Sequence, residues 1–254
     1  MRIQERDKEI LEDICKFQCL TSYQIAKLYE MNLKVCQRRL RKLCKNDYLR
    51  KLPIPSIKSG RSPYLYYLGE KGASLLNISI SKPRLTLQLS HQIKNTEIVI
   101  DIKCSFKNTN IQCDILPEHL IRKAQLELIP DCALKISKNN KNALFMLEIC
   151  MGTEIAKSPS CHEDVDSKIC RYTDFFDQND MQCYENYFGC NFKRFRLLFI
   201  ANSYQRLAGI SRIISEHDSY GFILISTLKE LKAKGISGKI WHVPALEQSH
   251  ISII

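Results

Sequence analysis

The sequence contains little glycine and proline, with 9 Gly and 8 Pro among 254 residues. This scarcity excludes collagen-like and low-complexity chains, and 44% hydrophobic with 26% charged residues exclude a wholly disordered chain. No run of about 18 apolar residues occurs, so we expect no membrane span. The start, Met1 to Lys16, alternates charged and apolar residues instead of offering a secretory signal, which predicts a cytoplasmic protein. Since no phosphate loop of the G-x4-G-K-[ST] type occurs, ATP use is not expected.

Paired metal ligands such as C-x2-C are also missing, although the chain has 12 cysteines. Their irregular spacing predicts reduced, mostly buried thiols that act as small hydrophobic residues, in place of a disulfide framework. The alternative is that some of these cysteines bind zinc. The densest group of candidate ligands is Cys161, His162, Cys170, Cys183 and Cys190.

Positive charge is concentrated in the first third of the chain. The formal net charge is +11, of which +8 falls within residues 1–80 and +3 within residues 81–254. Such a field favours a polyanionic partner. Nucleic acid and an anionic membrane surface are partners of this kind.

Residues 1–80 show the periodicities of a small helical domain with a hairpin. Ile10, Leu11 and Ile14 form an apolar helical stripe, and Thr21 followed by Gln24 is a capping-box pattern. The predicted elements are helices at 6–17, 22–29 and 33–45, strands at 47–52 and 64–68, and a closing helix at 69–76. The third helix buries Cys36 and Leu40 and turns a cationic face outward.

The runs RRLRKLCKNDYLRK and YLYYLGEKGASLL, in this order of elements, resemble the winged helix-turn-helix family. The resemblance implies a third helix that enters the DNA major groove and a wing that touches the backbone or minor groove. It assigns base contacts to Lys34, Gln37, Arg38 and Arg41, and phosphate contacts to Lys42, Lys45, Lys58 and Arg61. A solvated helix face, or a winged helix used for protein contacts, remains the alternative.

Residues 81–254 predict a second, α/β domain. The expected order is a helix at 85–100, strands at 111–116, 128–136 and 143–150, a helix at 164–177, a strand at 196–201, a helix at 205–217, and strands at 221–226 and 239–243. This order is typical of an α/β sandwich built on a mixed sheet.

Two carboxylates stand on neighbouring predicted strands of this domain. Asp131 follows Pro130, and Glu148 lies near the end of the next strand, so both can meet at one edge and bind Mg²⁺. The pattern resembles the PD-(D/E)XK nuclease fold, which implies metal-dependent cleavage of phosphodiesters, with Glu97 as an upstream helix acid. The alternative is that Asp131 caps a turn and Glu148 is an edge-strand residue paired with a lysine.

The sequence departs from that nuclease pattern at the position of its lysine. Cys150 stands there, and a neutral thiol cannot replace an ammonium group. Lys168 on the following predicted helix is the best substitute, and Arg171 is the second.

Taken together, the winged-helix layout and the segments IPDCALKI, LEICMGTE and KICRYTDFF resemble the replication-relaxation family of plasmid and mobile-element proteins, over residues 6–226. The resemblance implies a role in plasmid replication and DNA relaxation, with a carboxylate domain related to PD-(D/E)XK nucleases.

Three functions follow as hypotheses. The first is a double-stranded DNA-binding protein of a plasmid or mobile element, with other proteins of that element as possible partners. The second is a Mg²⁺-dependent nicking endonuclease with Asp131 and Glu148 as metal ligands and Lys168 and Glu97 in catalysis. The third is a dimeric transcription regulator, for which a palindromic target would be diagnostic. No cofactor other than Mg²⁺ is expected.

Overall fold

The computed structural model describes residues 2–54, 63–79, 83, 87–151, 164–178, 180–217, 221–244 and 248–253. The chain divides into two compact units, Met1–Ile100 and Asp101–Ile254, each of which is described by itself. The division falls within helix α5 (Leu87–Ser105), later than the boundary expected near residue 80. Residues 87–100 of this helix belong to the first unit, where Gln24 donates a hydrogen bond to the carbonyl of Ile93.

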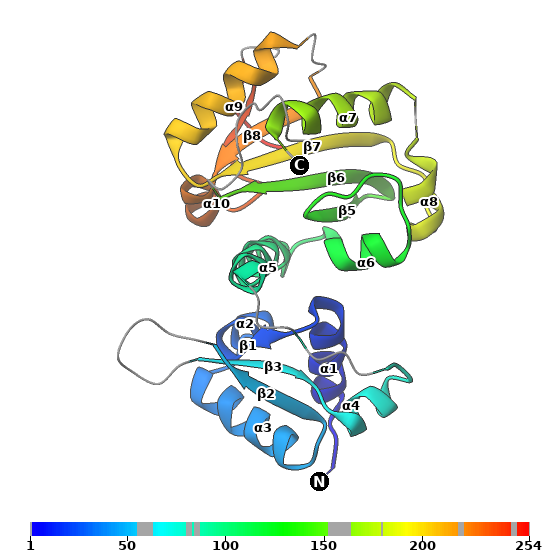
Figure 1. Ribbon diagram of the computed structural model, residues 1–254, viewed down its shortest axis with the longest axis vertical. Helices are drawn as coiled ribbons and strands as arrows, with labels where there is room; N and C mark the ends of the chain where they lie inside the picture. Colours follow the sequence, from blue (N-terminus) through cyan, green and yellow to red (C-terminus); the bar gives the residue numbers. More distant parts are fainter. Residues whose placement is uncertain are drawn as a thin grey trace. The chain divides into compact units, whose positions relative to one another are not determined.

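The first unit packs helices against a small antiparallel sheet (Figure 1). Its elements are α1 (Glu5–Phe17), β1 (Leu20–Thr21), α2 (Ser22–Leu28), α3 (Leu33–Lys45), β2 (Leu49–Pro53), β3 (Tyr64–Leu68) and α4 (Glu70–Leu75). The strand order is β1-β3-β2. The helices and the two longer strands confirm the elements predicted for residues 1–80, while the two-residue β1 was missed. Residues 55–62, with Lys58 and Arg61, lie outside the described residues.

Local signals explain where these helices begin. The capping box at α2 is present, with Thr21 accepting from the backbone of Gln24 and the Gln24 side chain accepting from the backbone of Thr21. Asn32 accepts from the backbone of Lys34 at the start of α3. One arginine of α3 turns inward, because Arg39 donates through its guanidinium to the buried carboxylate of Asp7 on α1. This ion pair links α3 to α1 and stabilises their packing.

The second unit is built on a seven-stranded mixed sheet of order β10-β9-β8-β7-β6-β5-β4. Its strands are β4 (Gln112–Pro117), β5 (Cys132–Lys138), β6 (Lys141–Cys150), β7 (Arg194–Ala201), β8 (Ile223–Thr227), β9 (Trp241–Val243) and β10 (Gln248–Ile251). Its further helices are α6 (Glu118–Lys123), α7 (Val165–Asp177), α8 (Gln182–Phe188), α9 (Tyr204–Glu216) and α10 (Leu228–Lys234). The chain is thus a mixed α/β protein, as predicted.

Strands β6, β7 and β8 are parallel, and all other pairings in this sheet are antiparallel. The connections between the parallel strands carry α7 and α9, which lie on the same face of the sheet (Figure 1). Side chains of α7 and α9 share one core with the alternate residues of β6 that face them, namely Leu144, Met146 and Cys150. The side chain of Glu148 belongs to this same face by strand alternation, which directs it toward α7.

Some predicted elements of this unit need correction. The strand expected at 128–136 begins only at Cys132, so Asp131 directly precedes it. Helices α6, α8 and α10 and strand β10 were not predicted. No helix among the described residues is long and apolar enough to cross a membrane.

Candidate functional site

A tight hairpin sets the register of the two carboxylates that the sequence singled out. Lys138 of β5 pairs with Lys141 of β6, and the intervening Asn139 and Asn140 have φ angles of 49° and 59°. Positive φ at both positions is what a two-residue type I′ turn requires, and asparagine tolerates it better than most residues. The register continues to Cys132 opposite Leu147. The residues just beyond this pair, Asp131 and Glu148, are therefore brought together.

Glu148 is almost completely buried, with 3% of its surface exposed, and both of its carboxylate oxygens are hydrogen-bonded. Lys168 Nζ donates to Oε2 over 2.6 Å, and the hydroxyl of Tyr172 donates to Oε1 over 2.6 Å. Lys168 and Tyr172 are four positions apart on α7 and so share one face of that helix. The carboxylate of Glu148 is therefore buried and accepts hydrogen bonds from one cation and one phenol.

Asp131 lies beside this pair and accepts a hydrogen bond at Oδ2 from the backbone N–H of Ile149 over 2.7 Å. Burial, and then the negative charge of Glu148, raise the pKa of Asp131 to about 8, against the lowering effects of the Ile149 N–H and of Lys168. Burial lowers the pKa of Lys168, but the charge and hydrogen bond of Glu148 outweigh it, so that its pKa is raised. Around neutral pH the Asp131 carboxyl group therefore holds its proton, beside the ammonium group of Lys168.

The donor chemistry of this site fits a hard divalent ion. Carboxylate oxygens on adjacent strands are ligands that Mg²⁺ accepts, and Asp131 and Glu148 would hold it. Since a ligating carboxylate must be deprotonated, binding would release the proton of Asp131. Lys168 would then supply positive charge next to the ion.

The structure brings together three of the four residues that the sequence assigned to this chemistry. Lys168 reaches Glu148 from α7, while Cys150 is buried in the core. Arg171, the second substitute for the missing lysine, is exposed on α7. Glu97, the fourth, belongs to the first compact unit, and its part in this chemistry stays a prediction.

Sequence reasoning missed two neighbours of the cluster. Tyr172 was not among the predicted site residues, although its spacing of four from Lys168 on one helix was a usable signal. Glu118, at the start of α6, donates its backbone N–H to the carbonyl of Asp131, and its charge also acts to raise the pKa of Asp131. No sequence pattern pointed to Glu118, since it depends on the pairing of β4 with β5.

We expect Asp131→Asn to flatten the pH dependence of stability. A carboxyl group whose pKa is raised from 3.8 to about 8 keeps its proton in the folded state and loses it in the unfolded state between these values. Its contribution makes the free energy of unfolding fall as pH rises through this window, by up to about 1.4 kcal/mol per pH unit. Asparagine does not titrate, so the variant lacks this fall in the free energy of unfolding, and its side-chain oxygen can still accept the hydrogen bond from the backbone N–H of Ile149. Urea unfolding from pH 4 to pH 9 measures the difference.

The matched control for that series is Asp174→Asn, which changes an exposed carboxylate on α7. It should follow the pH profile of the wild type. A profile of Asp131→Asn that is as steep as the wild-type profile would contradict the raised pKa of Asp131.

In the first unit, the exposed face of α3 carries the cations that the sequence predicted there. The side chains of this face that are exposed to solvent are Lys34, Arg38, Arg41, Lys42 and Lys45. Gln37 is half-buried, and its carbonyl accepts a hydrogen bond from Arg41 Nε over 3.3 Å. The buried side of the helix is formed by Cys36, Leu40 and Leu43. α3 therefore presents a row of cationic groups on a firmly packed helix.

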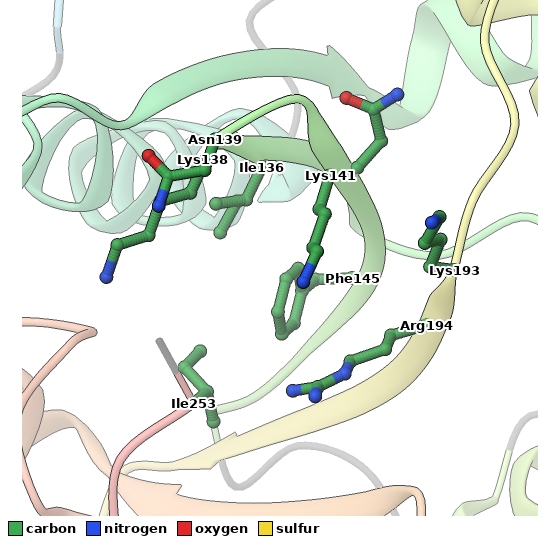
Figure 2. Close-up of a pocket in the computed structure, with 9 residues that line it drawn as sticks. Ile136, Lys138, Asn139, Lys141, Phe145, Lys193, Arg194 and Ile253 are labelled. Carbon is green, nitrogen blue, oxygen red and sulfur yellow. The ribbon is translucent and has the colours of Figure 1, made fainter.

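A second group of cations surrounds a pocket of about 560 Å³ at the turn end of the β5–β6 hairpin (Figure 2). Its polar lining is Lys138, Asn139, Lys141, Asn142, Lys193 and Arg194, and its apolar lining is Ile136, Phe145 and Ile253. Figure 2 shows Lys141 ending beside the Phe145 ring, with Arg194 extending toward the same opening. None of these lining residues is acidic, so the pocket favours an anionic group.

Of the cysteine and histidine group considered for zinc, Cys161 and His162 lie outside the described residues. Cys170, Cys183 and Cys190 are free thiols.

Comparison with known protein families gives a match for this chain. Residues 11–189 match the model of the family described as Replication-relaxation. The matched segment includes α3 and the Asp131, Glu148 and Lys168 cluster. A comparison with curated proteins finds no match.

Proposed function

The chain belongs to the replication-relaxation family, and on this premise we propose that it binds double-stranded DNA through its N-terminal unit. The family assignment supports a role in replication or relaxation of a plasmid or mobile element. DNA binding is our inference from the winged-helix layout of the first unit and from the surface of α3.

The observation that carries the proposal is the cationic face of α3. Arginine can read guanine and glutamine can read adenine through paired hydrogen bonds in the major groove. We assign base contacts to Lys34, Gln37, Arg38 and Arg41, near the N-terminal half of the helix. Lys42 and Lys45 in its last turn contact phosphates, as do Lys58 and Arg61 in the segment between β2 and β3.

The pocket at the hairpin turn supports a second set of phosphate contacts, on the C-terminal unit. Lysine and arginine side chains around an opening without acidic groups suit the phosphate backbone, which carries no base information. We assign sequence recognition to α3 and backbone contacts to both units.

The salt dependence of DNA binding tests this assignment. The logarithm of the binding constant should fall linearly with the logarithm of salt concentration, with a slope of about −0.9 for each phosphate neutralised. Lys42→Ala/Lys45→Ala and Lys141→Ala/Lys193→Ala should each reduce the slope by about 1 to 2. Fluorescence anisotropy with a labelled duplex at several salt concentrations gives the slopes.

Lys107→Ala/Lys229→Ala is the control for this comparison, because it removes two cations from places outside both surfaces. Its slope should equal that of the wild type. A wild type without measurable duplex binding at low salt would contradict the proposed function.

A second candidate function is favoured by the position of Lys168. In the nuclease pattern a cation next to the paired carboxylates stabilises developing negative charge, and Lys168 occupies such a place at 2.6 Å from Glu148. The candidate is Mg²⁺-dependent nicking of DNA, with Asp131 and Glu148 as metal ligands. Mg²⁺, when bound, would polarise the phosphodiester and help to generate hydroxide.

We expect wild-type protein to nick supercoiled plasmid with Mg²⁺ or Mn²⁺ if this candidate holds, and Asp131→Asn/Glu148→Gln to abolish nicking. Both substitutions keep side-chain shape but remove the negative charge that a divalent ion requires. Agarose electrophoresis of supercoiled plasmid and linear duplex, with each metal and with chelator, detects the product.

The control for this assay is Asp174→Asn, whose exposed carboxylate lies on α7 away from the pair. It should nick like the wild type. Nicking that persists in the double variant or in chelator would contradict a metal site at Asp131 and Glu148. If the wild type binds DNA but does not nick it, the nuclease candidate is contradicted and the proposed DNA-binding function stands.

A further inference from the structure

Three side chains of types that can ligate metals lie together at the β10 end of the sheet of the second unit, whereas Glu148 lies on β6. They are Glu230 of α10, His242 of β9 and His250 of β10, and one donor atom from each lies within 4.8 Å of the other two. Glu230 and His242 are half-buried and His250 is exposed. The group therefore has two imidazoles and one carboxylate, with access from solvent.

The backbone of β10 is irregular at the residue that completes the group. Gln248 pairs with Val243 and Ile251 pairs with Trp241, so that two residues of β10 stand opposite His242 alone. His250 is one of these two and has a φ of 59°, in the left-handed region that non-glycine residues rarely adopt. A bulge of this kind redirects a side chain. Here it accompanies the approach of the His250 ring to within 5.1 Å of the His242 ring, centroid to centroid.

The carboxylate is fixed by the start of its helix. Thr227, the N-cap of α10, accepts from the backbone N–H of Glu230 over 3.2 Å, and its hydroxyl lies 3.3 Å from Glu230 Oε2. Hydrogen bonds of this kind orient a ligating carboxylate. Glu230 is thus held where it faces both histidines.

The histidines have the chemistry of ligands. The neutral imidazole ring of histidine offers a nitrogen lone pair that binds transition metals. Neither ring has a hydrogen-bond partner among the described residues. Paired imidazoles with one carboxylate suit zinc, whereas Mg²⁺ prefers oxygen donors.

We propose that Glu230, His242 and His250 bind a zinc ion that fastens β10 to β9 and α10. Donor atoms around a tetrahedral zinc ion lie about 3.3 Å apart, so small side-chain rotations close the site. Three protein ligands leave a fourth position for water. This site is independent of the proposed DNA binding and of the carboxylates Asp131 and Glu148.

The test is a zinc titration of the metal-free, tag-free full chain in competition with a chromophoric chelator. We expect one equivalent of Zn²⁺ to bind to the wild type, and His242→Gln and Glu230→Gln each to weaken binding at least tenfold. Zn²⁺ should also raise the unfolding temperature of the wild type but not of His242→Gln. The matched control is His217→Gln, which changes a histidine paired with Asp166 and should leave zinc affinity unchanged.

Cobalt distinguishes this site from the cysteines. The first equivalent of Co²⁺ should give visible bands of nitrogen and oxygen coordination without a thiolate charge-transfer band. In chelator, His242→Gln should unfold at the same temperature as the wild type, which separates loss of metal from loss of fold. Absence of zinc binding, unchanged affinity in His242→Gln, or a thiolate band in the first equivalent would overturn the proposal.

Discussion

Reversing two charges on α3, in the variant Arg38→Glu/Arg41→Glu, is expected to weaken DNA binding at least about 100-fold. A paired arginine contact to guanine is worth about 1–3 kcal/mol, and the reversal also sets two negative charges against the phosphates. Both side chains are exposed, so that the fold should be unaffected. Anisotropy with a labelled duplex at low salt measures the loss.

The matched control for this variant is Arg6→Glu/Lys8→Glu, which makes the same change in net charge on exposed positions of α1. It should lower affinity by a few-fold at most, because long-range attraction is weakened but no contact is lost. Equal losses in the two variants would show a general charge effect and contradict α3 as the contact helix. Thermal unfolding of both variants checks that each is folded.

Removing the cation at the carboxylate site, in Lys168→Met, is expected to lower the free energy of unfolding by about 3–5 kcal/mol. The substitution leaves Glu148 buried without its ammonium partner, and within the described part of the chain only the Tyr172 hydroxyl still donates to that carboxylate. Loss of one partner of a buried ion pair costs more than loss of both, since the unpaired charge is not solvated. Urea unfolding at pH 7 measures the change.

Two further variants separate the charge effect from lost packing. Glu148→Gln/Lys168→Met removes both charges and should recover much of the lost stability. Arg171→Met, on the exposed side of the same helix, should change stability by less than about 1 kcal/mol. If the double variant is as unstable as Lys168→Met, packing and not an unpaired charge is the cause.

The sequence allowed prediction of those elements that are long enough to repeat a pattern. Helices α1 and α3 each span 13 residues and show a regular apolar stripe, and the capping box of Thr21 and Gln24 marks the start of α2. The same reasoning located strand β6 and the start of α7. Lys168 could be proposed as the cation near Glu148 because a helix after a strand returns across the sheet.

Several elements of two to seven residues escaped prediction because they carry too few positions for a period to appear. Strand β1 has two residues, and α6, α8 and α10 have six or seven. Strand β10 contains Gln, Ser and His, and these polar residues give no strand signal. Such segments are fixed by pairing and packing with distant parts of the chain.

Groups of side chains drawn from several elements escaped prediction for a related reason. Glu230, His242 and His250 have no motif spacing, and only the order of β8, β9 and β10 brings them together. Tyr172 reaches Glu148 only because strand alternation turns that carboxylate toward α7.

Photochemical cross-linking of the full chain to duplex DNA, followed by mass spectrometry of the peptides, tests most directly whether α3 is the DNA-contacting helix. We expect cross-linked peptides from Leu33–Lys45, together with peptides that contain Lys141 or Lys193. The cross-links in α3 should be lost in Arg38→Glu/Arg41→Glu and retained in Arg6→Glu/Lys8→Glu. Efficient cross-linking without any peptide from α3 would contradict DNA recognition by this helix.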